Sequence, residues 1–208
     1  AMAAPLDGWP ALWALCEGKR AVGFGPGVPE TAEMGALLDR LLRQCSVPVV
    51  LDAGGLNLLA ARPGVLDPKE RRAPLAVTPH PGEAARLGKT TVAEVQRDRV
   101  GWAREFASRH AVHVALKGAR TVVAAPDGRA WINPTGNAGM ASGGVGDVLL
   151  GVVGSLSCQG VPLPDALLAA VFLHGKAGDL ARDRRGEMGL IARDVVERLP
   201  EVLSGWSL

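Results

Sequence analysis

The chain of 208 residues contains no tyrosine, so no phenol is available as an acid or a base. Its three cysteines, Cys16, Cys45 and Cys158, lie far apart and form no C-x-x-C pair. This argues against a disulfide framework or a structural zinc site and favours a reducing compartment. The first residues, AMAAPLDGWPALW, lack a basic segment before an apolar run, so no signal peptide is predicted. We therefore expect a cytoplasmic protein.

The chain also has little excess of charge of either sign. Its 23 Lys and Arg residues nearly balance its 21 Asp and Glu residues, which gives a net charge of +2. So weak a charge excludes nucleic acids and anionic membranes as main partners. The longest uncharged apolar stretch, residues 148–164, contains three glycines and two prolines. It is typical of a buried helix with its exit loop rather than a membrane span. Neither a repeat nor a linker divides the sequence, which predicts a single domain over residues 1–208.

Short apolar runs alternate with helical periodicity along the chain. The runs predict strands over residues 20–24, 47–51, 75–77, 112–116, 121–125 and 130–132, the last two joined as a hairpin by Pro126-Asp127-Gly128. The periodic segments predict a helix from Pro29 to Cys45, a second that begins at a capping box over residues 91–94 and continues to Phe106, and others over 145–157, 164–182 and from 192. This alternation predicts an α/β fold with a mostly parallel sheet and helices on both faces.

Three polar side chains, Asp52, His80 and Lys117, lie at or just after the carboxyl ends of predicted strands. Ligands of such folds gather outside the carboxyl ends of the strands. The shared position predicts an active site at that edge of the sheet.

Two nucleotide-binding motifs fail on inspection. The run from Gly82 to Thr90 resembles a Walker A loop, but five residues separate its glycines where the phosphate cradle needs four, and they are helix formers. The run Gly23-Phe-Gly25-Pro-Gly27 lacks the third glycine of the dinucleotide fingerprint.

The informative stretch is glycine-rich and runs from Asn133 to Asp147, directly into an apolar helix. Glycines let backbone N–H groups approach a ligand, and the free N–H groups of a helix start favour anions. Gly143, Gly144 and Gly146 are therefore candidates for an anion hole around a transferring phosphoryl group, with Asp147 beside it. The alternative is that Asp147 only stabilises the helix start through the helix dipole.

Several motifs in one order resemble the ADP/ATP-dependent NAD(P)H-hydrate dehydratases of the ribokinase-like superfamily. They are Thr78-Pro-His-Pro-Gly-Glu83, Lys117-Gly-Ala-Arg-Thr121, Gly136-Asn137, Gly-Met-Ala-Ser-Gly-Gly-Val-Gly-Asp147 and His174-Gly-x-Ala-Gly-Asp179, and the match runs from about Arg20 to Asp179. The resemblance implies a three-layer αβα ribokinase-like fold. It also implies repair of NADHX or NADPHX, reduced nicotinamides hydrated at C6, to NAD(P)H at the expense of ADP or ATP.

The resemblance further implies the role of each residue. Asp147 would orient or deprotonate the C6 hydroxyl and is the expected catalytic residue. Gly27, His80, Asn57 and Asp147 would bind the hydrate. The nucleotide would contact Lys117, Gly118, Ala119, Arg120, Thr121, Asn137, Gly144 and Gly146. Mg²⁺ would be shared between phosphate oxygens and few protein ligands, so no dedicated metal-binding residue is expected. The family's symmetric oligomers make a homo-oligomer one expectation.

Several of these residues have simpler alternatives. His80 between two prolines could cap a turn, Asn137 could stabilise one, and Lys117 could be a plain lysine at a strand end. His174 within an apolar helix could be a core histidine. The pair His110 and His113 straddles a helix end and a strand, which argues against a shared metal.

The sequence departs from the family's pattern in three places. It has Asp52-Ala-Gly54-Gly55-Leu56-Asn57 where the family usually has Asp-Ala-Asp-Ala-Leu-Asn, and loss of the second carboxylate is expected to weaken substrate or cation positioning. Val145 replaces a small or hydroxyl residue. The family's glycine-rich N-terminal segment is not recognisable, so we expect an N-terminally shortened domain.

Two other functions fit the same residues. One is a ribokinase-like kinase of a sugar or vitamin alcohol, which would leave a phosphorylated product. The other is a catalytically idle nucleotide-binding protein, as the shortened N-terminus and Gly54 would suggest.

Overall fold

Six short strands form one sheet, in which their spatial order is their order along the chain. The structure, a computed structural model, describes residues 8–204. Part of the N-terminal stretch over which no signal peptide is predicted lies outside these residues. The strands are β1 (Val22–Phe24), β2 (Val49–Leu51), β3 (Leu75–Val77), β4 (His113–Leu116), β5 (Val122–Ala124) and β6 (Ala130–Ile132).

The first four strands are parallel to one another, and the last two reverse the direction. β4 pairs antiparallel with β5, and β5 pairs antiparallel with β6, which confirms the predicted hairpin. Two reversals return the end of β6 to the edge at which β1 to β4 end. The loops after β1, β2, β3, β4 and β6 therefore all leave from one edge of the sheet.

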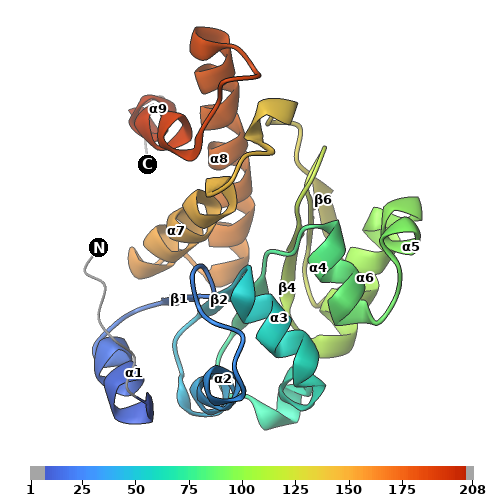
Figure 1. Ribbon diagram of the computed structural model, residues 1–208, viewed down its shortest axis with the longest axis vertical. Coiled ribbons are helices and arrows are strands. Elements are labelled where there is room, and N and C mark those ends of the chain that lie inside the picture. Colours follow the sequence, from blue (N-terminus) through green and yellow to red (C-terminus); the bar gives the residue numbers. More distant parts are fainter. Residues whose placement is uncertain (1–7, 205–208) are drawn as a thin grey trace.

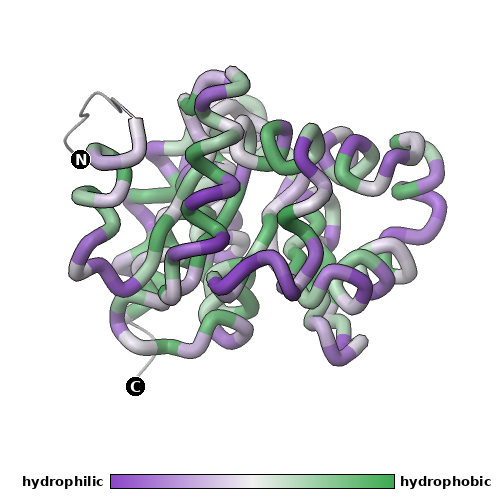
Figure 2. Tube along the Cα trace, turned by 90° about the horizontal axis from the view of Figure 1, so that it is seen from below, coloured by the Kyte–Doolittle hydropathy of each residue, from purple (hydrophilic) through white to green (hydrophobic). Residues whose placement is uncertain are grey.

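Helices connect these strands and cover the sheet. They are α1 (Gly8–Cys16), α2 (Ala32–Gln44), α3 (Gly54–Ala61), α4 (Pro81–Gly88), α5 (Val92–Arg97), α6 (Arg99–His110), α7 (Val145–Cys158), α8 (Leu163–Arg185) and α9 (Ala192–Ser204), with short 3-10 turns η1 (Pro63–Leu66), η2 (Pro68–Glu70) and η3 (Ala138–Met140). In Figure 2, hydrophobic and hydrophilic stretches alternate along the helices, as expected when each turns one side to the interior.

Alternate residues of each strand point to opposite faces of the sheet, and two cores result. Val49 and Leu51 pack with α2, α3 and α6, whereas Val50 packs with α7 and α8. Figure 1 shows these helix groups on either side of the strands. The predicted three-layer α/β fold is confirmed. A third cluster joins α8 to α9.

Two helix predictions need correction. The helix predicted from Pro29 begins at Ala32, because the Thr31 hydroxyl accepts a hydrogen bond from the Met34 amide and caps it there. The single helix predicted over residues 91–106 is two helices. Asp98 ends α5, and its side chain caps α6 by accepting from the Gly101 amide.

Among the described residues, no helix combines the length and the apolar character that a membrane span requires.

Candidate active site

The first residues after β2, β3 and β4 continue the hydrogen bonding of the sheet. The amides of Asp52, Thr78 and Lys117 donate to the carbonyls of Phe24, Leu51 and Pro79. Their backbones are thus fixed one step beyond the strands. Asp52 and Thr78 are buried and Lys117 is half-buried. Polar side chains therefore lie inside the protein at this edge of the sheet.

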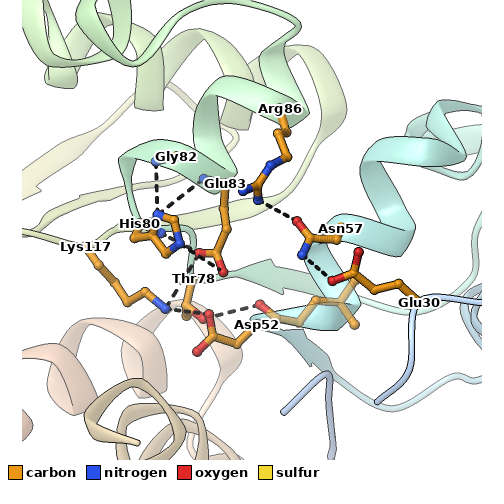
Figure 3. A network of polar contacts seen from close by, with 10 residues as sticks. Glu30, Asp52, Asn57, Thr78, His80, Gly82, Glu83, Arg86 and Lys117 are labelled. Carbon is orange, nitrogen blue, oxygen red and sulfur yellow. Dashed lines mark hydrogen bonds and ion pairs between the residues drawn. The ribbon is translucent and has the colours of Figure 1, made fainter. Parts of the chain in front are cut away.

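Two of these residues meet Glu83 of α4 to form the ion-pair cluster, defined as Asp52, Lys117 and Glu83. Lys117 Nζ lies 2.5 Å from Asp52 Oδ1 and 3.9 Å from Glu83 Oε2. Both carboxylate side chains are at most 6% exposed, so each needs the shared ammonium as its counter-charge. Figure 3 shows the three side chains pointing toward one another from separate elements.

His80 lies beside this cluster as the N-cap of α4. Its Nδ1 accepts hydrogen bonds from the Gly82 and Glu83 amides, and the Glu83 carboxylate accepts one from the His80 amide. Because Nδ1 is an acceptor, the proton of the neutral ring resides on Nε2. Nε2 lies 3.5 Å from Glu83 Oε1, and the side chain is half-exposed. The ring therefore caps the helix and keeps its Nε2–H close to the Glu83 carboxylate.

The start of α7 lies directly on the ion-pair cluster. A methyl group added at Gly146 would lie 3.0 Å from Asp52 Oδ2 and 3.2 Å from Lys117 Nζ. Glycine at this position lets the helix backbone approach the two charges. Asp147 follows, exposed in the first turn.

The backbone donors at this helix start are uncapped. Gly144 is the N-cap, with a φ of 82°, and provides no side-chain hydrogen bond. Val145 N–H donates to Ser142, but within residues 8–204 no acceptor contacts the amides of Gly146 and Asp147. We call these two amides the α7 cradle. Unpaired amides at a helix start form an anion-binding site.

The loops after β1 and β2 interlock through glycines. A methyl group at Gly25, where φ is 139°, would lie 1.7 Å from the Asp52 carbonyl oxygen, and one at Gly55 would lie 2.7 Å from that of Phe24. Gly54 is equally confined, since a methyl group there would lie 2.6 Å from the Val28 carbonyl oxygen. A side chain at position 54, where the resembled family usually has an aspartate, would therefore begin in space that the backbone of this chain occupies.

Ala53 in this corner adopts a conformation that suits glycine, with φ 47° and ψ −125°. Such a backbone costs an alanine about 1–3 kcal/mol. We expect Ala53→Gly to raise the free energy of unfolding by about 1 kcal/mol after the added entropy of the unfolded chain is subtracted. Urea unfolding measures this. Ala93→Gly, in the exposed face of α5, should instead lower it by about 1 kcal/mol. Equal changes in the two variants would contradict the prediction.

The segment from Asn133 to Met140 is bound to α8. Gly136 N–H and Asn137 Nδ2 donate to the two carboxylate oxygens of Asp179, and Asn137 Oδ1 accepts from the Gly139 amide. A methyl group at Gly178 of α8 would lie 2.2 Å from the sulfur of Met140. Glycine on α8 therefore makes room for this segment. Protein groups engage both ends of the Asn137 amide, and its contact with a nucleotide stays a prediction.

The loop from Lys117 to Thr121 begins in the ion-pair cluster, at Lys117. Arg99 of α6 donates to the carbonyls of Leu116 and Lys117, and Thr121 Oγ1 donates to Gly118. Gly118, Ala119 and Arg120 are exposed. The loop has a fixed base and an open outer surface.

His174 holds α7 to α8, since its Nε2 lies 3.0 Å from the Val145 carbonyl oxygen. It is a satisfied core histidine. Burial first of all, with a smaller contribution from the Lys117 charge, lowers its pKa to about 4. The folded protein therefore keeps the ring neutral at pH values at which the unfolded chain protonates it.

We expect the stability that this histidine confers to be complete above pH 6.5 and to be lost as the pH falls to about 4. A shift of this size corresponds to about 3 kcal/mol. His174→Gln, which keeps an N–H donor, should lose less stability over that window than the unmodified chain does. Urea unfolding at pH 7.5 and pH 4.5 tests this, and equal losses in the two proteins would contradict it.

Comparison with known proteins identifies a family. The family model described as NAD(P)H-hydrate dehydratase matches residues 10–201. The chain belongs to this family. An ADP-dependent (S)-NAD(P)H-hydrate dehydratase of Bacillus subtilis is 41% identical over 199 residues, which are 94% of this chain and 69% of that protein. The expected relationship is confirmed.

Longer relatives also match. A bifunctional NAD(P)H-hydrate repair enzyme of Moorella thermoacetica is 44% identical over 182 residues, 88% of this chain but 34% of its own length. The chain thus spans about a third of such bifunctional relatives.

Solved structures confirm the ribokinase-like fold. The ADP/ATP-dependent NAD(P)H-hydrate dehydratase of Bacillus subtilis, crystallised with ATP and Mg²⁺, aligns with a TM-score of 0.82 and 38% identity over 90% of this chain and 67% of that structure. Hydroxyethylthiazole kinase of Pyrococcus horikoshii shares the fold at 17% identity and a TM-score of 0.73.

The structure brings together some of the residues that the family resemblance singles out. His80 and Lys117 share contacts with Glu83, and Gly146 lies against Asp52 and Lys117. Gly27 is exposed, with a φ of 72° and no atom within 4 Å of an added methyl group. Asn57 of α3 instead hydrogen-bonds to Glu30 and Arg86.

A cavity of about 390 Å³ lies between β6 and α8. None of the residues expected to bind substrate or nucleotide lines it.

Proposed function

We propose that this chain catalyses the ADP- or ATP-dependent dehydration of (S)-NADHX and (S)-NADPHX to NADH and NADPH. The observation that carries the proposal is the α7 cradle, two unpaired amides beside the exposed Asp147 carboxylate and next to the half-buried Lys117 ammonium. Membership of the NAD(P)H-hydrate dehydratase family supports it.

The reaction requires a poor leaving group to be made a good one. The C6 hydroxyl attacks the terminal phosphorus of the nucleotide, so a P–O bond forms on the C6 oxygen and the bond to the leaving AMP or ADP breaks. The lone pair of the ring nitrogen then expels phosphate from C6. Transfer of the C5 proton to the departing phosphate or to water then restores the reduced nicotinamide, with release of inorganic phosphate.

The residues divide this work between them. Asp147 accepts the proton of the C6 hydroxyl, because it is exposed next to the cradle and has no ion-pair partner in the described part of the chain. The amides of Gly146 and Asp147 bind the phosphoryl oxygens as their charge develops. His80 presents its Nε2–H to the hydrate from the neighbouring helix start.

The loops on either side would hold the two ligands. The nucleotide lies against residues 117–121, Asn137 and Gly144, and the hydrate lies against Gly27 and Asn57. Protein groups already engage both ends of the side-chain amides of Asn137 and Asn57.

The donors fit a magnesium ion that arrives with the nucleotide. The Asp147 carboxylate is open beside the cradle, whereas those of Asp52 and Glu83 are paired with Lys117. Residues 8–204 contain no group of three His, Cys, Asp or Glu side chains able to hold a metal. Magnesium would neutralise phosphate charge during the transfer.

The deciding experiment incubates the chain with NADPHX, a nucleotide and Mg²⁺, and follows the absorbance of reduced nicotinamide together with phosphate release. Both signals should rise in equal amounts with ADP or with ATP. A phosphorylated product without phosphate release would identify a kinase. Nucleotide binding without turnover would identify an idle homologue.

We further infer a cytoplasmic location and a small-molecule metabolic role. The three cysteines are all free thiols in the structure, which suits a reducing compartment. A homo-oligomer is the assembly that the family suggests, and light scattering of the purified chain tests it.

A further inference from the structure

A second, separate chain of hydrogen bonds lies near the ion-pair cluster. Asn57 Nδ2 donates to Glu30 Oε1 at 2.6 Å, and Arg86 Nη1 donates to Asn57 Oδ1 at 2.7 Å. The three residues come from the loop before α2, from α3 and from α4. Figure 3 shows these three side chains beside the ion-pair cluster, and no dashed line joins the two groups.

Arg86 differs from Lys117 in how its charge is met. Its hydrogen-bond partner is a neutral amide, and no carboxylate of residues 8–204 lies within 4 Å of its guanidinium. Asn57 therefore fixes the direction of the guanidinium without neutralising it. The Glu30 carboxylate accepts a hydrogen bond from Asn57 Nδ2. The amide is therefore oriented with its Oδ1 toward Arg86. The result is an exposed, oriented cation with further N–H donors free.

The position of Arg86 relates it to the reacting groups. It lies on α4, the helix that His80 caps, and its partner Asn57 lies on α3, which begins two residues after Asp52. Arg86 is therefore anchored to the two helices that follow Asp52 and His80, and in the view of Figure 3 it lies across Glu83 from Lys117, the residue against which Gly146 of the cradle packs. A ligand that reacts at the cradle and passes over His80 would extend toward it.

We propose that Arg86 is a substrate-binding residue that holds a phosphate group of the dinucleotide hydrate, with Asn57 and Glu30 as its positioning residues. The inference rests on the proposed function. NADHX carries a pyrophosphate, and NADPHX carries an additional 2′-phosphate, neither of which takes part in the reaction. A guanidinium binds phosphate through two parallel hydrogen bonds, and this geometry suits either group.

The test compares Arg86→Ala with the unmodified chain on three substrates: NADHX, NADPHX and the hydrate of reduced nicotinamide riboside, which has no phosphate. We expect KM for the dinucleotides to rise about tenfold, the effect of one charge-assisted hydrogen bond at an exposed site, with kcat changed less than threefold. On the riboside the two proteins should behave alike. Equal losses for NADHX and NADPHX indicate the pyrophosphate, and a loss confined to NADPHX indicates the 2′-phosphate.

Two further variants separate recognition from structure. Arg97→Ala removes a charge from an exposed position of α5 and should leave KM unchanged. Asn57→Asp keeps Arg86 but gives it a carboxylate partner, so KM for the dinucleotides should rise as well. An unchanged KM in Arg86→Ala, or an equal loss on the riboside, would overturn the proposal.

Titration of NADH and NADPH by calorimetry keeps this test independent of the proposed reaction. If the unmodified chain fails to form NADH from NADHX, the proposed function fails. Arg86 is then judged on product binding, which should weaken about tenfold in Arg86→Ala. Equal affinities in the two proteins would refute it.

Discussion

Asp147→Asn is expected to lower turnover of NADHX and NADPHX about a thousandfold while the affinity for ADP changes only a few-fold. General-base catalysis contributes about 10²–10⁴ to a rate, and the amide of asparagine cannot accept the proton of the C6 hydroxyl. The side chain is exposed, and no other described residue depends on it for a hydrogen bond. The measurements are steady-state kcat and a calorimetric titration of ADP.

A matched variant separates catalysis from helix stability. Asp147 and Asp165 occupy the third positions of α7 and α8, and both are exposed. Each carboxylate stabilises its helix by about 0.3–1 kcal/mol through its interaction with the helix dipole. Asp165→Asn should therefore match Asp147→Asn in stability and retain full turnover. Near-normal kcat in Asp147→Asn would remove this residue from the catalytic role.

Lys117→Met is expected to lower the free energy of unfolding by about 3 kcal/mol. The substitution leaves the carboxylates of Asp52 and Glu83 buried without a counter-charge, and removal of one partner of a buried ion pair typically costs about 3–5 kcal/mol. The lower end applies because the lysine side chain is 20% exposed. Urea unfolding at pH 7 measures the change.

Rescue identifies unpaired charge as the cause. In the Lys117→Met background, Asp52→Asn removes one of the uncompensated charges and should restore stability, whereas alone it should destabilise the protein. The double-mutant cycle then gives a coupling energy of about 1–3 kcal/mol. A cycle that closes near zero would show that the lysine acts through packing of its methylene groups.

The sequence predicts strands better than it predicts helix boundaries. The apolar runs at residues 75–77 and 130–132 are bounded by proline or polar residues, and both strands have the predicted bounds. The helix after β1 begins three residues late, because Thr31 competes with Pro29 for the start. α3 escapes prediction altogether, since it begins with two glycines that intrinsic propensity disfavours.

The site is predictable as a set of strand ends and only partly as a set of contacts. Asp52 and Lys117 follow predicted strands, and parallel strands bring them to one edge. The role of Glu83 depends on its burial against Lys117, 34 positions later in the sequence. Helix and strand periodicity relates only residues that are close in sequence, so it cannot predict this contact. The capping box of His80 and Glu83 was a missed signal, because the motif is normally recognised by serine or threonine at the first position.

The antiparallel pair of strands β5 and β6 determines how the two sides of the site are encoded. β5 runs back along the sheet and β6 returns to the same edge. The loop at residues 117–121, the segment 133–140 that packs on α8, and the start of α7 therefore all come from one uninterrupted stretch of about thirty residues. The opposite side is assembled from three separate stretches around Gly25, Asp52 and His80. The first side is therefore contiguous in sequence and fixed from outside by α6 and α8, whereas the second requires three distant stretches to be placed together.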